Sequence, residues 1–181
     1  MSIRTSFFNN IEYDAMSVNR RFAHMFSDGV IAGESAIDTA LKVSLQSGLT
    51  LKISNGIYHI QGAVLEVYGN GETITLSAAS TQARYDAVCV EYNLNAGVNN
   101  ARLVTVSGTP AASPEYPTLT RTDLMWQCPL AYVLVPANAS SAGNIIDARD
   151  QSKVKTLTYG YGTSLPATGN EGDIFFLITS E

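Results

Sequence analysis

The chain has 181 residues, of which 45% are hydrophobic and only 15% are charged. This length fits one compact domain, or one domain with an appendage, and the hydrophobic content excludes a disordered chain. The 11 basic and 16 acidic residues give a net charge of −5, which excludes a polybasic nucleic-acid-binding surface. The low charge content also excludes a coiled coil.

The N-terminal residues contain no apolar run long enough for a signal peptide, and no segment approaches the roughly 20 apolar residues of a membrane span. We therefore expect a protein that is made in the cytoplasm and leaves it only through assembly or lysis. Cys89 and Cys128 each lie in an apolar segment. In a reducing compartment this favours two buried free thiols over a disulfide.

Residues 15–27 carry the only clear helical pattern. Their apolar residues recur with a period near 3.6, which predicts an amphipathic helix; they are Ala15, Val18, Phe22, Met25 and Phe26. Asp14 is the expected N-cap, and Gly29 follows the expected end. Arg20 and Arg21 lie off the apolar stripe and are expected to face solvent or a partner.

From about residue 40 the period of the apolar residues drops to two, which is typical of strands with one buried face. Three turn signals separate the apolar runs: Gln46-Ser47-Gly48, Asn55-Gly56 and Gly69-Asn70-Gly71. Strands are expected at residues 41–45, 49–53, 57–60, 63–68 and 74–76.

The second half of the chain alternates between buried-strand patterns and loops. Residues 85–92 hold a continuous apolar run, which is typical of a strand covered on both faces. Residues 107–122 contain three prolines and are expected to form an extended connector, because proline cannot donate to a strand ladder. Further strands are expected at residues 103–106, at 130–135 directly after Pro129, and in a short closing segment at 144–149.

A final strand pair is expected at residues 153–158 and 173–178. A change of composition near Asp150 divides a body, residues 1–150, from a C-terminal β-hairpin extension, residues 151–181. With about ten short strands and one helix, the chain is expected to be mainly β, or α+β by count. The predicted fold is an antiparallel β-sandwich or partial barrel with one N-terminal amphipathic helix.

Catalytic, metal-binding and cofactor-binding residues are not predicted. The two histidines, His24 and His59, lack the spacing of a zinc motif, and the cysteines form no Cys-x-x-Cys pair. Arg149 follows Asp147 by two residues, which favours a structural ion pair over acid–base or calcium chemistry. The sequence therefore predicts a protein that is not an enzyme.

Two tyrosines between glycines are the weak candidates for a contact surface. Tyr159 and Tyr161 alternate with Gly160 and Gly162, so neighbouring side chains give them little cover. Tyrosine offers a flat apolar face with a polar edge, which suits either a sugar or a subunit contact. Arg20 and Arg21 are the other candidates for partner contacts.

Several short motifs, read in order, resemble those of one family. Together they span most of residues 13–178, and each falls on a turn or strand expected above. They are Tyr13-Asp14-Ala15, Asp28-Gly29-Val30, Asn55-Gly56-Ile57-Tyr58, Arg84-Tyr85-Asp86-Ala87-Val88-Cys89-Val90, Ser107-Gly108-Thr109-Pro110, Leu130-Ala131-Tyr132-Val133-Leu134-Val135, Ile145-Ile146-Asp147-Ala148-Arg149 and Gly169-Asn170-Glu171-Gly172-Asp173.

In this order the chain resembles the small tail-tip and baseplate proteins of long-tailed bacteriophages, and the N-terminal shoulder module of phage receptor-binding proteins. The resemblance implies a non-enzymatic virion structural protein that docks to other tail or baseplate proteins, and a homotrimer around the tail axis. The sequence has no long heptad run to enforce a trimer, so a monomer is the equal alternative. The sequence stops where a receptor-binding protein continues into a stalk and head, which favours a stand-alone structural part. The alternative is a module that binds host cell-wall polysaccharide through Tyr159 and Tyr161.

Overall fold

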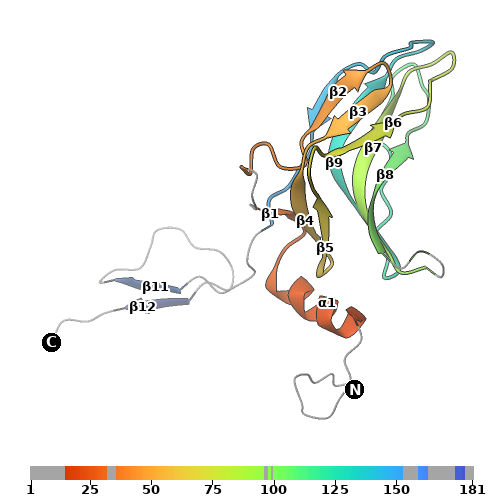
Figure 1. Cartoon of the computed structure of the whole chain (residues 1–181). Helices are drawn as coiled ribbons and strands as arrows, with labels where there is room; N and C mark the ends of the chain where they lie inside the picture. The colour runs from red at the N-terminus through yellow and green to blue at the C-terminus, as the bar shows by residue number, and fades with distance from the viewer. Residues whose placement is uncertain are drawn as a thin grey trace.

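The protein is a β-sandwich with one helix at its end (Figure 1), as the sequence predicts. The computed structural model describes residues 15–31, 36–95, 98, 100–152, 159–162 and 174–177. Three antiparallel sheets build the sandwich, and none of them closes into a barrel.

One layer is a four-stranded sheet in the order β10-β9-β7-β8. Its two long central strands, β7 (Arg84–Asn93) and β9 (Met125–Val135), pair with each other along their whole length. The edges are β8 (Asn100–Ser107) and the short β10 (Ile145–Asp147). All residues of β7 except one are buried, because both faces of this strand are covered; this confirms the two-sided burial that its apolar run predicts.

The other layer consists of two three-stranded sheets, which lie one above the other in Figure 1. The upper sheet has the order β2-β3-β6, and the lower one has the order β1-β4-β5. The upper strands are β2 (Val43–Ser47), β3 (Thr50–Ile53) and β6 (Glu72–Thr75), and the lower strands are β1 (Gly29–Ile31), β4 (Gly56–Ile60) and β5 (Ala63–Val67).

The hydrophobic core lies between the two layers. Alternate residues of β3 and β4, such as Leu51, Ile53 and Ile60, pack against the inward residues of the long strands, such as Val90 and Leu130. The turn expected at Gln46-Ser47-Gly48 leads from β2 into β3, and the turn expected at Gly69-Asn70-Gly71 leads from β5 into β6. The period of two therefore predicted the inward side chains of β3, whereas Leu45 of β2, expected on the same face as Val43, is exposed.

Two ion pairs with a spacing of two residues fix loops to the sandwich. Arg84 donates from Nε to Asp86 Oδ1 at 2.7 Å, and both side chains are almost completely buried. The remaining donors of Arg84 reach the carbonyl oxygens of Ser77 and Ala78, and Asp86 also accepts from the Gly108 amide. Because the charges are paired and hydrogen-bonded, the cost of burying them is offset.

The second ion pair closes the body. Arg149 donates from Nη2 to Asp147 Oδ2 at 2.6 Å, and a further bond runs to the Asp38 carbonyl at 3.0 Å. The hydrogen bonds that the Arg149 side chain donates hold the pKa of Asp147 below its usual value. The pair thus has the structural role expected for it.

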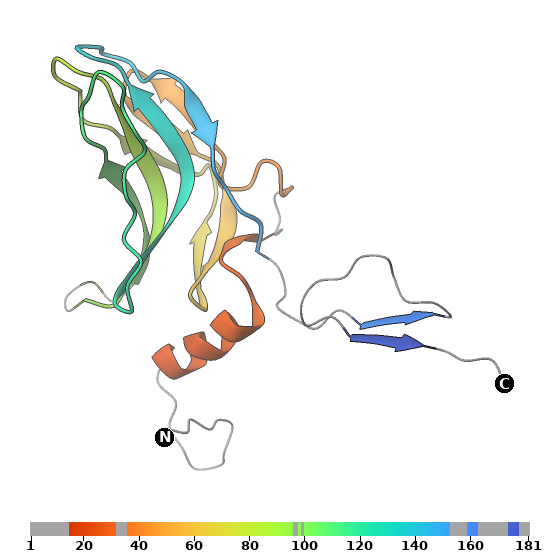
Figure 2. The ribbon, with the colours of Figure 1, turned by 180° about the vertical axis from the view of Figure 1, so that it is seen from behind.

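The proline-containing connector between β8 and β9 covers the outer face of the four-stranded sheet (Figure 2). Tyr116 of this connector stacks on Tyr132 at 4.2 Å between ring centroids and meets Tyr85 edge-on at 4.9 Å. The backbones of Thr120 and Gln127 are hydrogen-bonded. The connector holds no strand, as the prolines predict.

A buried polar cluster lies under the end of this connector. Glu91 accepts hydrogen bonds from Asn93, Arg102 and Gln127 at 2.7 to 3.0 Å. Burial alone would raise the pKa of Glu91, but these hydrogen bonds outweigh it and hold the pKa below its usual value. The sequence analysis assigned no role to this carboxylate.

The predicted start of β9 is wrong. Pro129 lies inside the strand, which begins at Met125, whereas the sequence places Pro129 directly before it. The pairing of β7 with β9 shifts register between Val88 and Cys89, and Cys89 lies opposite Pro129. Such an irregularity accommodates a residue that has no N–H to donate.

The described C-terminal strands pair differently from the strand pair expected at residues 153–158 and 173–178. β11 (Tyr159–Gly162) and β12 (Ile174–Leu177) pair parallel, so they are not the two arms of a hairpin. Parallel partners need a crossover connection instead of a tight turn. Residues 153–158, where one strand was expected, lie outside the described residues, and the boundary near Asp150 stays a prediction.

Candidate functional site

The candidate site lies on the outer face of the sheet β1-β4-β5. Along β4, Tyr58 and Ile60 point into the core, so the residue between them, His59, points to the opposite face. In the sheet register His59 lies between Gly29 of β1 and Val64 of β5. A histidine and a valine therefore form part of an outer surface that the sandwich core does not cover.

The helix α1 (Ala15–Met25) partly covers this surface. Its contact is set by the turn between β4 and β5, where Gln61 and Gly62 have φ values of 49° and 82°. Two successive positive φ values are typical of a tight hairpin turn. A Cβ on Gly62 would lie 1.6 Å from the Asn19 carbonyl oxygen, so only glycine lets the helix backbone approach this closely.

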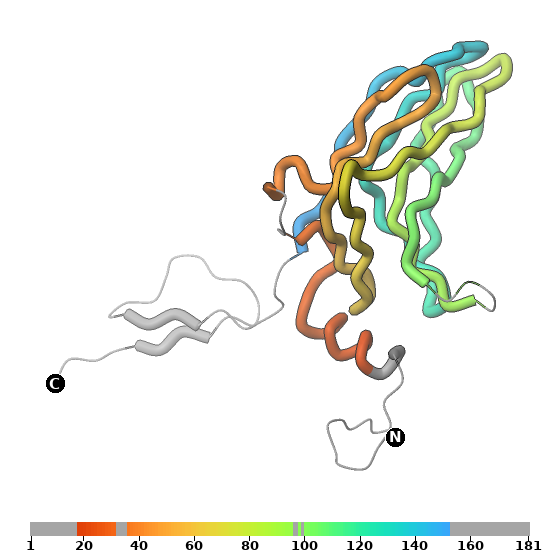
Figure 3. Tube along the Cα trace, in the orientation of Figure 1, coloured from red at the N-terminus to blue at the C-terminus, as the bar shows by residue number. Residues whose placement is uncertain are grey.

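Asp28 fixes the segment that leads from the helix into β1. Its carboxylate accepts from the Gln61 amide and from Gln61 Nε2, both at 2.8 Å. On the other side of β1, residues 150–152 run alongside (Figure 3), with the Val30 amide bonded to the Asp150 carbonyl at 2.7 Å. Asp28-Gly29 was expected only to end the helix, and its role as an anchor was missed.

The apolar stripe of α1 is not buried, which corrects the orientation expected from the sequence. Phe22 and Met25 are 43% and 49% exposed, whereas Arg20 and Arg21 are half-buried. The helix lies at the end of the sandwich, beside the β4–β5 hairpin (Figure 1), and only its C-terminal part, with Phe22, reaches the outer face of the sheet β1-β4-β5. Only part of the stripe can therefore find cover within the described chain.

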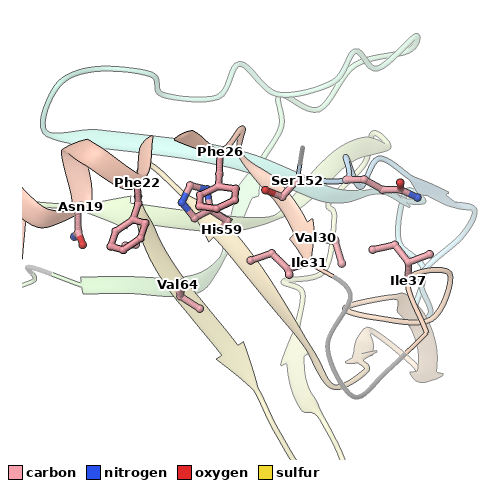
Figure 4. A pocket seen from close by; sticks show the side chains of 12 residues that line it. Asn19, Phe22, Phe26, Val30, Ile31, Ile37, His59, Val64 and Ser152 are labelled. Carbon is pink, nitrogen blue, oxygen red and sulfur yellow. The ribbon is translucent and has the colours of Figure 1, made fainter. Parts of the chain in front are cut away.

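Between α1 and the sheet lies an open groove with a volume of about 860 Å³ (Figure 4). Its walls are mainly apolar, and they include Phe22, Phe26, Val30, Ile31, Ile37 and Val64. The rings of Phe22 and Phe26 stack at 6.5 Å, and Phe26 meets the His59 ring edge-on at 5.5 Å. Val64 on the rim is 59% exposed.

His59 is the polar group of interest in the groove. Its ring is 3% exposed, and Nδ1 lies 3.2 Å from the Ser27 carbonyl oxygen. A carbonyl only accepts, so Nδ1 must donate, and in the neutral ring Nε2 is then an acceptor. Nε2 is buried and has no hydrogen-bond partner among the residues that the structure describes. Native proteins rarely leave such an atom unpaired.

The other candidates from the sequence do not join this site. Tyr159 and Tyr161 lie on β11, where they pair with Ile174 and Phe176 of β12, and their side chains are outside the described part. Arg20 and Arg21 lie on α1 but do not line the groove. The structure therefore does not bring the four residues together in one described site.

The two cysteines are free and buried, as predicted. Cys128 lies opposite Val90 and Cys89 opposite Pro129, so the two side chains leave the sheet on opposite faces. Burial raises the pKa of Cys89 to about 12 and that of Cys128 to about 11. Both thiols stay protonated at neutral pH, which makes them poor nucleophiles.

Within the described ranges, His, Cys, Asp and Glu side chains nowhere form a group of three suited to a metal ion. The groove itself was missed by sequence reasoning. One feature of the sequence could have indicated it: His59 alternates with Tyr58 and Ile60, so its side chain points to the other face of the sheet from these two core residues. The exposure of Phe22 depends on where the helix docks, and the helical period does not contain that information.

No protein-family model matches the chain, and no curated protein matches it. Among the described residues, no helix has the length and apolar character needed to cross a membrane.

Proposed function

We propose that the protein is a non-enzymatic structural component of a bacteriophage tail tip or baseplate, and that it docks to other tail proteins. The observation that carries the proposal is the apolar surface at α1. Val18, Phe22, Met25 and Val64 are all between 40% and 59% exposed. Contiguous exposed apolar surface next to a groove is typical of protein-interaction sites.

The resemblance to phage tail proteins supports the kind of assembly. Its motifs Arg84-x-Asp86 and Asp147-x-Arg149 form the two ion pairs that fix loops to the sandwich. A sandwich whose loops are fixed by ion pairs, and which exposes apolar side chains at α1, suits a protein that is built into a larger particle.

The test is a binding assay with three targets. Purified protein is incubated with intact particles of the phage that encodes it, with tail-defective particles, and with host cells. Retention by particles that have tails, without retention by tail-defective particles or cells, is the expected result. Absence of the protein from purified virions, measured by mass spectrometry, would contradict the proposal.

The host-cell sample also tests the alternative of polysaccharide binding. Retention by cells that is lost in a Tyr159→Ala/Tyr161→Ala double variant, with the fold unchanged by circular dichroism, would favour a receptor-binding module. The docking proposal predicts that this double variant binds tails as the wild type does.

A further inference from the structure

The unpaired nitrogen of His59 gives the groove a chemical preference. Nδ1 is committed to the Ser27 carbonyl, so the free Nε2 of the neutral ring accepts and cannot donate. In Figure 4 the nitrogen-bearing edge of the ring faces the side of the groove where Phe22 of α1 lies. A group that satisfies this atom must bring an N–H or O–H into an apolar surrounding.

The groove walls add a second preference. Phe22 and Phe26 line the helix side of the groove, and the His59 ring lies with Val64 and Ile31 on the sheet side. Aromatic rings prefer offset or edge-on contacts with other rings, which a flat guest satisfies better than a branched aliphatic one. The volume of about 860 Å³ leaves room for one large side chain together with its neighbours.

Taken together, these features match an aromatic side chain with a polar hydrogen. We propose that the groove binds a tyrosine or tryptophan side chain of the protein on which this chain docks, with its O–H or N–H donating to His59 Nε2. The proposal rests on the docking function proposed above and specifies the chemistry of the partner. Tyrosine and tryptophan are enriched at the energetic centres of protein interfaces.

The proposal requires Phe22 to move when the guest binds. Nε2 is covered in the free protein, and Phe22 is 43% exposed, so it lacks close packing on its outer side. Rotation of this ring about its side-chain bonds opens the groove toward His59. The guest ring then takes its place against Phe26.

Two small molecules that differ by one hydroxyl test the preference. 4-Methylphenol reproduces the tyrosine side chain, and toluene lacks the donor. The full chain is expected to bind 4-methylphenol about tenfold more tightly than toluene, because toluene leaves the buried acceptor unpaired. In nitrogen-15 NMR spectra of the histidines, the His59 Nε2 resonance is expected to shift when 4-methylphenol is added and to stay in place when toluene is added.

His59→Phe is the matched variant, since it keeps a ring and removes the acceptor. It is expected to bind the two probes equally. If this variant does not fold, Val64→Asp provides the second test, because Val64 is exposed on the rim and its change leaves the core intact. Val64→Asp is expected to weaken both probes. Equal binding of the two probes by the wild type, or binding of neither, overturns the proposal.

Particle binding separates this inference from the function on which it rests. Loss of tail binding by Val64→Asp and His59→Phe, with binding by the wild type, supports the aromatic guest. Tail binding by all three proteins leaves the docking function standing and overturns the guest. Binding by none contradicts the docking function itself. Self-association of the wild type that Val64→Asp abolishes would show that a second copy covers the groove instead, and would also overturn the proposal.

Discussion

The buried charged groups of the sandwich and the buried histidine of the groove beside α1 differ in how they are paired. Between the layers and under the connector, Arg84, Asp86 and Glu91 have partners for their charges. In the groove, His59 Nε2 is buried without one, and the neighbouring Phe22 is partly exposed. Among the described residues, the buried charges of the sandwich are therefore paired, whereas the groove presents a buried acceptor beside a partly exposed ring.

The largest expected effect is the loss of one partner of the buried ion pair. Asp86→Ala leaves the Arg84 guanidinium buried without its counter-charge, which costs about 3–5 kcal/mol of unfolding free energy. Chemical denaturation measures this loss. The double variant Arg84→Met/Asp86→Leu removes both charges and is expected to recover much of it; a double variant no more stable than Asp86→Ala would contradict the account.

The strands were largely predictable, because period-two alternation and turn residues are local signals. The stretch 56–60 is an example: Gly56 opens the strand, and the alternation from Ile57 to Ile60 assigns each side chain to a face. The start of β9 was not predictable in this way. Pro129 is locally unsuited to a strand, and only the register shift opposite Cys89 makes it acceptable.

The candidate site was much less predictable than the fold. The groove depends on the docking of α1 against Gly62, which is a contact between segments about forty positions apart. The helical period is equally compatible with a buried stripe and with the partly exposed one that the structure shows. The partner-contact role predicted for Tyr159, Tyr161, Arg20 and Arg21 stays a prediction.

One truncation in the core and one in the groove compare how tightly the two regions are packed. Leu130→Ala removes a completely buried core side chain and is expected to cost about 2–5 kcal/mol. Phe22→Ala removes a half-exposed ring from the groove and is expected to cost about 1 kcal/mol or less. Thermal or chemical unfolding of both variants checks this, and similar losses would show that the groove is packed as tightly as the core.

Substitutions at two glycines with positive φ distinguish the cost of backbone strain from the cost of disturbing the helix contact. Gly62 has φ 82° and a Cβ there would meet the Asn19 carbonyl, whereas Gly69 has φ 63° and open space around it. Gly69→Ala is expected to cost about 1 kcal/mol from the backbone alone. Gly62→Ala should cost more and expose the α1 segment to amide hydrogen exchange. Equal effects of the two changes would contradict close helix docking.

The smallest expected effect is a pH dependence of stability from Glu91 and Asp147. Both carboxyl groups have pKa values below their usual range in the folded protein. Their contribution is therefore present above the unfolded pKa values of about 4 and is lost as the pH falls through the lower folded values. Each of the variants Glu91→Gln and Asp147→Asn is expected to lose less unfolding free energy than the wild type when the pH falls below about 4.

The most direct test of the docking account is a crosslink inside the assembled particle. A photo-reactive amino acid is placed at Val64 on the groove rim, or at Leu45 on β2, which is also exposed and lies at the other end of the sandwich (Figure 1). The account predicts that position 64 crosslinks to another tail protein and that position 45 does so far less. Crosslinks from position 45 alone, or from neither position in particles that contain the protein, would contradict it.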